Sequence, residues 1–195
     1  APKQVISRSK AKVGDAIVVT GCHGASSAGL ELMLNPDITT SLEKNYREAL
    51  IKAHQRPKPR LDVLPILWEI VDSYSVTDIS GMDTSDGLAD AILQVCQCSQ
   101  VGAVIEATQI SLHKAFENWL SPQKALEYAL YGGEDFELLL CLPKQAAGEL
   151  VQKLGGDTAI IGTITDSDKV LLHDQQEKTP DQVLNLNRGF QHFTD

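Results

Sequence analysis

Several features that would assign this chain to a common class are absent from its sequence. No stretch approaches the ~18 consecutive apolar residues of a membrane-spanning helix, and no charged segment followed by an apolar one opens the chain as a secretory signal would. There is no G-x-x-x-x-G-K-[ST] loop, which excludes the commonest P-loop architecture. Basic residues are scarce, because 17 Lys and Arg stand against 26 Asp and Glu, for a formal net charge of -9. We therefore predict a soluble, cytoplasmic protein that binds neither nucleic acid nor membrane.

Cysteine is also sparse. Cys22, Cys96, Cys98 and Cys141 are unevenly spaced, and no second Cys/His pair completes a zinc-binding pattern. We expect these residues to be reduced thiols in the core or on the surface.

The length and the element pattern bound the fold. A chain of 195 residues with 43% hydrophobic content can bury one sizeable core, and it is short for two independent domains. We expect a single domain over residues 1–195. The first residue is Ala1 rather than Met, which suggests a piece of a longer protein.

Apolar periodicity and turn residues predict strands that alternate with helices throughout the chain. The predicted class is therefore α/β or α+β, with a mixed sheet layered by helices. We expect the last two strands to pair with each other across the turn at residues 166–168. The predicted strands cover residues 16–20, 78–82, 102–107, 136–142, 158–165 and 169–173, and the predicted helices cover residues 30–34, 41–53, 61–73, 86–98, 113–120, 121–130 and 143–154.

The most informative motif is Asp83-Thr84-Ser85-Asp86-Gly87, which joins a predicted strand to a predicted helix. Two carboxylates with a hydroxyl between them can present hard oxygen atoms to Mg²⁺, while the helix start directs N–H groups at an anion. The alternative is helix capping, since Asp and Ser are favoured N-cap residues and could satisfy the first N–H groups of the helix.

A second motif places a glycine turn and three acids directly before an apolar strand. Gly132-Gly133-Glu134-Asp135-Phe136-Glu137 runs into Leu138–Leu142. Alone this motif is weak, because Gly-Gly often marks a turn and acids often guard strand ends. Its weight comes from its combination with the first motif.

Both motifs combine with Val13–Gly21, with the small-residue stretch 26–30, and with His54–Arg60, the only notable basic cluster. In this arrangement the chain resembles, from about residue 7 to about residue 193, the carboxy-terminal half of the thiamine-monophosphate kinase family. That family belongs to a superfamily with aminoimidazole ribonucleotide synthetase and selenophosphate synthetase. The resemblance implies the fold of the carboxy-terminal domain of aminoimidazole ribonucleotide synthetase, in a homodimeric two-domain protein whose amino-terminal ATP- and Mg²⁺-binding domain is absent from this chain.

The activity implied by the resemblance is direct, in-line phosphoryl transfer from ATP to thiamine monophosphate, which gives thiamine diphosphate and ADP. This chemistry needs positioning and charge neutralisation rather than a nucleophile from the protein, so no catalytic residue is expected here. Two alternatives are another ATP-using synthetase of the superfamily and a non-catalytic ligand-binding domain. The implied site comprises Asp83 and Asp86 as Mg²⁺ ligands, Arg8 and Ser85 as ATP contacts, and Glu134 and Phe190 as contacts to thiamine monophosphate.

The sequence departs from the family pattern at one turn. Where relatives commonly carry an acid after the glycine of G-D-S-A-A-G-L, this chain has Ala25. Any role of that acid is therefore absent or relocated. His23 and His54 lie near this turn and in the basic cluster, and a lone histidine there is more often structural than catalytic.

Overall fold

The computed structural model describes residues 5–38, 42–174 and 181–185. Its centre is one mixed eight-stranded sheet in the order β1-β3-β5-β2-β6-β4-β7-β8. The predicted class, a mixed sheet layered with helices, is confirmed. The strands are β1 (Ile6–Ser7), β2 (Ala16–Val19), β3 (Ile79–Asp83), β4 (Gly102–Glu106), β5 (Leu138–Leu142), β6 (Ala159–Thr165), β7 (Val170–His173) and β8 (Gln182–Val183).

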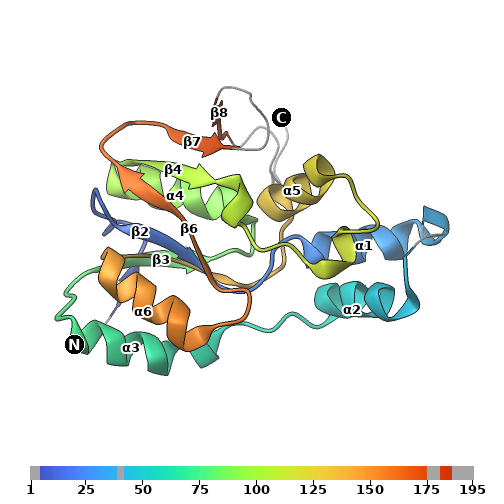
Figure 1. Cartoon of the computed structure of the whole chain (residues 1–195), viewed down its shortest axis with the longest axis horizontal. Coiled ribbons are helices and arrows are strands. Elements are labelled where there is room, and N and C mark those ends of the chain that lie inside the picture. Colours follow the sequence, from blue (N-terminus) through green and yellow to red (C-terminus); the bar gives the residue numbers. More distant parts are fainter. Residues whose placement is uncertain (1–4, 39–41, 175–180, 186–195) are drawn as a thin grey trace.

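Among the described residues, six α-helices cover this sheet or extend from one of its ends (Figure 1). Figure 1 shows α4 over one face and α3 with α6 over the other. Apolar side chains of α4 and α5 form one core with the sheet, and those of α3 and α6 form a second. The helices are α1 (Ala25–Leu34), α2 (Lys44–Gln55), α3 (Leu64–Ser73), α4 (Leu88–Ser99), α5 (Pro122–Tyr131) and α6 (Lys144–Leu154).

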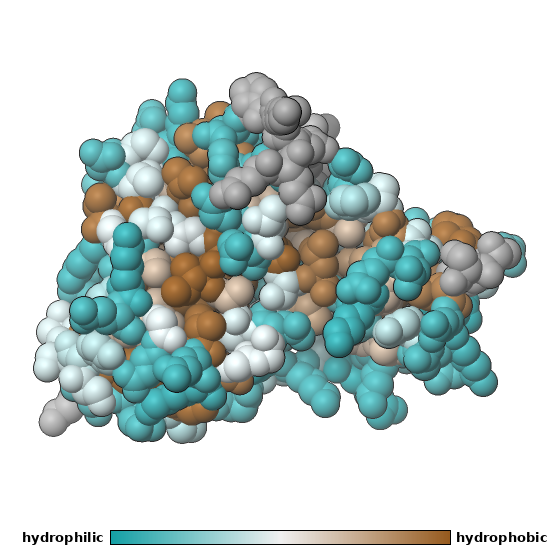
Figure 2. Space-filling view, in the orientation of Figure 1, coloured by the Kyte–Doolittle hydropathy of each residue, from teal (hydrophilic) through white to brown (hydrophobic). Residues whose placement is uncertain are grey.

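The pair α1 and α2 projects from the end of the sheet where β2 and β3 finish (Figure 1). A third apolar cluster, which includes Leu32, Leu50 and Phe116, joins the pair to α5 and to the short 3₁₀ turn Lys114–Phe116. Figure 2 shows hydrophobic residues at the far end of this projection, where Leu34 and Ile38 are exposed. None of the helices described is both long enough and apolar enough to span a bilayer.

The interior strands fix the end of the sheet where the two sequence motifs meet. β5 lies between β3 and β2 and is antiparallel to both, with Leu138 opposite Asp83 and Leu139 opposite Val19. Continuous apolar runs are typical of such strands, because both of their faces are covered. The start of β5 therefore lies beside the ends of β2 and β3.

The predicted pairing of the last two long strands is wrong. β4 lies between them, antiparallel to β6 and parallel to β7. The turn after β6 passes over the first residue of β4, where the Ala103 N–H donates to the Lys169 carbonyl at 3.0 Å. Gly102 permits this crossing, because a Cβ atom there would lie 2.7 Å from the Ser167 carbonyl oxygen. The short turn between β6 and β7 favours a hairpin. The parallel partner of β7 is β4, which is distant in the chain, so no local sequence pattern indicates this pairing.

Two helix predictions also need correction. No α-helix forms over residues 113–120, where the structure has only the 3₁₀ turn Lys114–Phe116, with the buried Phe116 packed into the third apolar cluster. The helix expected from Leu30 begins at Ala25, because the small residues before Leu30 are themselves helical. The predicted start of α5 is confirmed, since the Ser121 hydroxyl accepts a hydrogen bond from Lys124 N–H and Pro122 is the first helical residue.

Candidate functional site

The first motif forms a turn between β3 and α4 in which a glycine, and neither Asp83 nor Ser85, is the N-cap of the helix. Asp83 is the last residue of β3 and is exposed. Gly87, at a φ of 107°, is the N-cap of α4, and this residue makes no side-chain capping hydrogen bond. The Ser85 hydroxyl donates instead to Asp83 Oδ1 at 3.1 Å. The alternative that Asp83 or Ser85 is the N-cap of this helix is therefore wrong.

The second motif lies directly against this turn. Thr84 N–H donates to the Glu137 carbonyl at 2.9 Å, and Glu134 N–H donates to the Ser85 carbonyl at 2.7 Å. Gly133 allows the close approach, because a Cβ atom at that position would lie 2.7 Å from the Ser85 carbonyl oxygen. Backbone hydrogen bonds thus join the two motifs that the sequence separates by about fifty residues.

An open cavity of about 770 Å³ lies beside the junction and brings together four of the predicted site residues: Arg8, Asp83, Ser85 and Asp86. Glu134 is exposed and borders the junction through its backbone N–H, although its side chain does not line this cavity. Phe190 lies outside the described residues.

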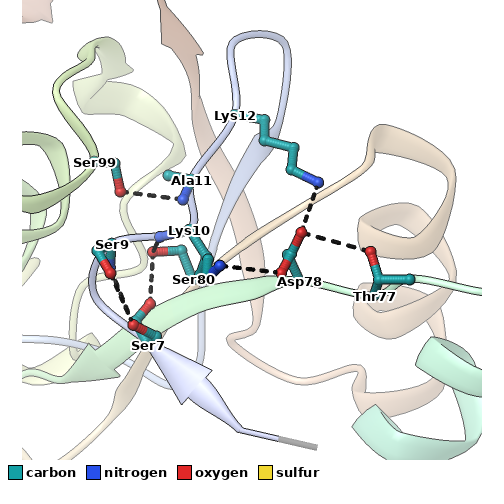
Figure 3. Close-up of polar contacts among 9 residues, drawn as sticks. All are labelled: Ser7, Ser9, Lys10, Ala11, Lys12, Thr77, Asp78, Ser80 and Ser99. Atoms are coloured by element: carbon teal, nitrogen blue, oxygen red, sulfur yellow. Dashed lines mark hydrogen bonds and ion pairs between the residues drawn. The ribbon is translucent and has the colours of Figure 1, made fainter.

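Hydrogen bonds attach the segment that carries Arg8 to the sheet and to α4 (Figure 3). The Ser80 hydroxyl donates to the Ser7 carbonyl at 2.8 Å, and Ala11 N–H donates to the Ser99 hydroxyl at 3.1 Å. Lys12 reaches Asp78 at 3.0 Å in the same view. Arg8, which the sequence placed near a chain end, is therefore held beside β3.

The sequence did not indicate two further residues at this cavity. One of them lines its wall, and the other binds the side chain of the first. Gln94 of α4 lines the cavity, and its side chain contacts both Arg8 and Asp90. Burial raises the pKa of the Asp90 carboxyl, and the nearby Asp86 charge raises it further. Their spacing of four residues on a predicted helix was the only available signal, since it places both on one helix face.

The other two acids of the second motif, Asp135 and Glu137, are half-buried; each binds other elements of the fold, and both also line a second cavity. Asp135 accepts hydrogen bonds from Gly24 N–H at 2.6 Å and from Ser26 N–H at 2.9 Å, at the start of α1. Burial raises the pKa of Asp135 to about 6, although these N–H groups oppose the rise. A carboxylate thus does reach the turn that contains Ala25, and it comes from Asp135.

Glu137 is held by side chains from two other elements. Thr20 donates to its carboxylate at 2.5 Å, and Arg60 donates to it at 2.8 Å while also pairing with Asp62. These bonds raise the pKa of Arg60, with the Asp62 hydrogen bond as the largest cause. One cation of the basic cluster is therefore structural, whereas Arg56 and Lys58 line a separate cavity of about 350 Å³.

The two histidines are placed as structural residues. His23 is fully buried, and neither of its ring nitrogens has a hydrogen-bond partner among the described residues. Burial lowers its pKa to about 4. His54 Nδ1 lies 3.0 Å from the Ser26 hydroxyl. Neither residue lines the cavity that contains Asp83.

The carboxylates of Asp83 and Asp86 fit a Mg²⁺ site that is completed by other ligands, rather than one formed by this chain alone. Asp83 and Asp86 supply carboxylate oxygens to one cavity, but no group of three or more His, Cys, Asp or Glu side chains suited to a metal occurs among the described residues. Mg²⁺ is commonly bound by one or two carboxylates together with water and substrate phosphates. The residues present therefore fit a metal ion that a nucleotide helps to hold.

Comparisons with known proteins identify the family of this chain. Residues 12–175 match the family model described as AIR synthase related protein, C-terminal domain. The thiamine-monophosphate kinase of Synechococcus elongatus is 47% identical over 193 residues, which cover 99% of this chain and 56% of that protein. The chain thus spans about half the length of this relative.

Solved structures show the same relationship. The thiamine-monophosphate kinase of Stenotrophomonas maltophilia K279a superposes with a TM-score of 0.72 at 26% identity, over 90% of this chain and 54% of that one. A structure described as AaThiL complexed with AMPPCP and TMP superposes with a TM-score of 0.68 at 28% identity, over 92% of this chain and 53% of that one.

Proposed function

Because the chain belongs to the AIR synthase related protein, C-terminal domain family, we propose that it is the carboxy-terminal domain of a two-domain thiamine-monophosphate kinase. The complete protein transfers the γ-phosphoryl group of ATP to the phosphate of thiamine monophosphate, and the products are thiamine diphosphate and ADP. The amino-terminal domain supplies the rest of the nucleotide and metal site.

The observation that carries this proposal is the single cavity shared by Arg8, Asp83, Ser85 and Asp86. A guanidinium and two carboxylates in one cavity suit a ligand that combines phosphate groups with a divalent cation. The 47% identity to a thiamine-monophosphate kinase, and the binding of AMPPCP and TMP by a structural relative, support the choice of substrates.

Each predicted site residue then has a proposed role. Arg8 pairs with phosphate oxygens of ATP, and Ser85 contacts the same nucleotide from the turn before α4. Asp83 and Asp86 would hold Mg²⁺ together with the phosphates, and a bound metal ion would supply charge neutralisation there. Glu134, exposed beside this turn, accepts a hydrogen bond from the exocyclic amine of the thiamine pyrimidine. Phe190 stacks on the substrate.

Transfer in this site needs no covalent intermediate on the protein. The terminal phosphate oxygen of thiamine monophosphate attacks the γ-phosphorus of ATP while the bond to ADP breaks. The chain's contribution is to bind and orient both phosphates, so an isolated domain that neutralises the γ-phosphate poorly should not turn over.

The test uses the complete protein with ATP, Mg²⁺ and thiamine monophosphate. We expect thiamine diphosphate and ADP in equal amounts, and no turnover by the 195-residue chain alone. ATP binding without product would identify a ligand-binding protein instead. Phosphorylation of a different acceptor only would identify another synthetase of the superfamily.

A further inference from the structure

We propose that Gln94 is a positioning residue that directs the Arg8 guanidinium into the nucleotide cavity, and that Asp90 fixes the orientation of Gln94. This inference rests on the proposed function, because it concerns the side chain that would meet the ATP phosphates. It adds two residues of α4 to that site.

The three side chains form a directed chain of hydrogen bonds. Arg8 Nη1 donates to Gln94 Oε1 at 2.5 Å, and Gln94 Nε2 donates to Asp90 Oδ2 at 2.5 Å. An amide group has one acceptor end and one donor end, whereas an ionised carboxylate only accepts. Asp90 therefore holds the donor end of Gln94, and the acceptor end is left facing Arg8.

The backbone of Arg8 is held by the same helix. The Ser99 hydroxyl donates to the Arg8 carbonyl at 2.9 Å, and Ala11 N–H donates to Ser99 at 3.1 Å. Arg8 is thus fastened to α4 at its main chain and again at its guanidinium. This double attachment matters because the Arg8 side chain is exposed and would otherwise adopt many rotamers.

A neutral amide suits this task better than a carboxylate. A carboxylate placed directly on Arg8 would form a charge-assisted pair that an incoming phosphate must break. Gln94 occupies one N–H group of the guanidinium without placing a charged group directly on it, although Arg8 still interacts electrostatically with the nearby Asp90. Arg8 and Gln94 line the same cavity, so the remaining N–H groups lie where an anion can reach them.

The experiment measures ATP and thiamine-monophosphate binding separately in the complete protein. The dissociation constant for AMPPCP is measured by calorimetry, and KM is measured for each substrate. For Gln94→Leu, which removes the contact, we expect the AMPPCP dissociation constant to rise by about fivefold, and for Gln94→Glu, which neutralises Arg8, by about tenfold or more. KM for thiamine monophosphate should stay close to that of the unsubstituted protein in both variants, and so should the melting temperature of Gln94→Leu.

Gln97 provides a matched control, because it is an exposed glutamine on the same helix and does not line the cavity. Gln97→Leu and Gln97→Glu should leave AMPPCP binding unchanged. If Gln94 acts through Arg8, Gln94→Leu should have no further effect in an Arg8→Ala background.

Three results would overturn the inference: equal AMPPCP affinity in the Gln94 and Gln97 variants, an undiminished Gln94→Leu effect in the Arg8→Ala background, or parallel loss of both substrates with a lowered melting temperature. A complete, unsubstituted protein that binds no nucleotide would overturn the proposed function, and the inference with it. Normal turnover with insensitive Gln94 variants would overturn the inference alone.

Discussion

The turn between β3 and α4 and the loop Gly132–Glu137 are both acid-rich, yet they use their carboxylates differently. In the turn, Asp83 is exposed and lines a cavity of about 770 Å³. In the loop, Asp135 binds two N–H groups at the start of α1, and Glu137 binds Thr20 and Arg60. An acidic motif in a sequence can therefore hold a ligand or hold the fold, and only the partners within the chain distinguish the two uses.

The contrast extends to neighbouring residues within the loop. Glu134 is exposed, while Asp135 is directed at the start of α1. Glu134 and Phe136 have φ values of 69° and 54°, which non-glycine residues adopt only at a cost. This backbone sends adjacent acids in different directions, and the hydrogen bonds of Asp135 help to maintain it.

The largest expected effect separates the structural acid from the exposed one. Asp135→Ala leaves the Gly24 and Ser26 N–H groups without their acceptor, so the free energy of unfolding should fall by about 3 kcal/mol. Asp83→Ala removes an exposed side chain and should change it by no more than about 0.5 kcal/mol. Urea denaturation of each variant measures both values, and similar losses would remove the distinction between the two acidic regions.

The next prediction concerns how the free energy of unfolding depends on pH. It rests on His23, the buried residue that precedes the turn bound by Asp135. The pKa of His23 is lowered to about 4 by burial, whereas the unfolded chain protonates this residue near pH 6.5. Between these values the unfolded state binds the extra proton, so this contribution to stability is present above pH 6.5 and is lost as the pH falls toward 4. The full decrease in the free energy of unfolding from this contribution is about 3 kcal/mol.

His23→Leu should remove that pH dependence, and stability at pH 7 should change little, because the replaced ring makes no hydrogen bond among the described residues. The variant must be compared with the unsubstituted protein at each pH. Asp135, with a pKa raised to about 6, contributes a change of opposite sign over part of the same range. Parallel stability curves for the two proteins would show that His23 is not the group responsible.

The sequence predicted the mixed sheet layered with helices, but it could not predict how the acids of the two motifs are used. Most strand and helix positions followed from local apolar patterns, and the start of α5 followed from Ser121 and Pro122. The β4 insertion between β6 and β7 depends on long-range pairing, which no local pattern contains. Likewise, the partners of Asp135 lie 109 and 111 residues away in the chain, and Gln94 reaches Arg8 across 86 residues.

A smaller effect tests whether the exposed acid binds a metal ion. Asp83→Asn keeps the shape of the side chain and removes its charge, and no capping role is at stake because Gly87 caps α4. In the complete protein we expect an unchanged melting temperature and a turnover at least about tenfold lower, which corresponds to about 1.4 kcal/mol of barrier. Raised Mg²⁺ should restore part of the rate. An unchanged rate at low Mg²⁺ would remove Asp83 from the metal site.

The smallest expected effect separates the energetic cost of the Glu134 backbone conformation from the role of the Glu134 carboxylate in substrate binding. Glu134 has a φ of 69° and an exposed side chain, so Glu134→Gly should relieve strain and raise the free energy of unfolding by about 0.5–1 kcal/mol. Glu134→Ala removes the same carboxylate but keeps the strained φ, and it should bring no such gain. Both variants should bind thiamine monophosphate more weakly in the complete protein, since both lack the acceptor for the pyrimidine amine. Denaturation and thiamine-monophosphate titration of the two variants therefore give independent answers. A gain in stability confined to the glycine variant assigns the strain to the backbone. Normal substrate affinity in both variants would exclude the Glu134 carboxylate from the substrate site.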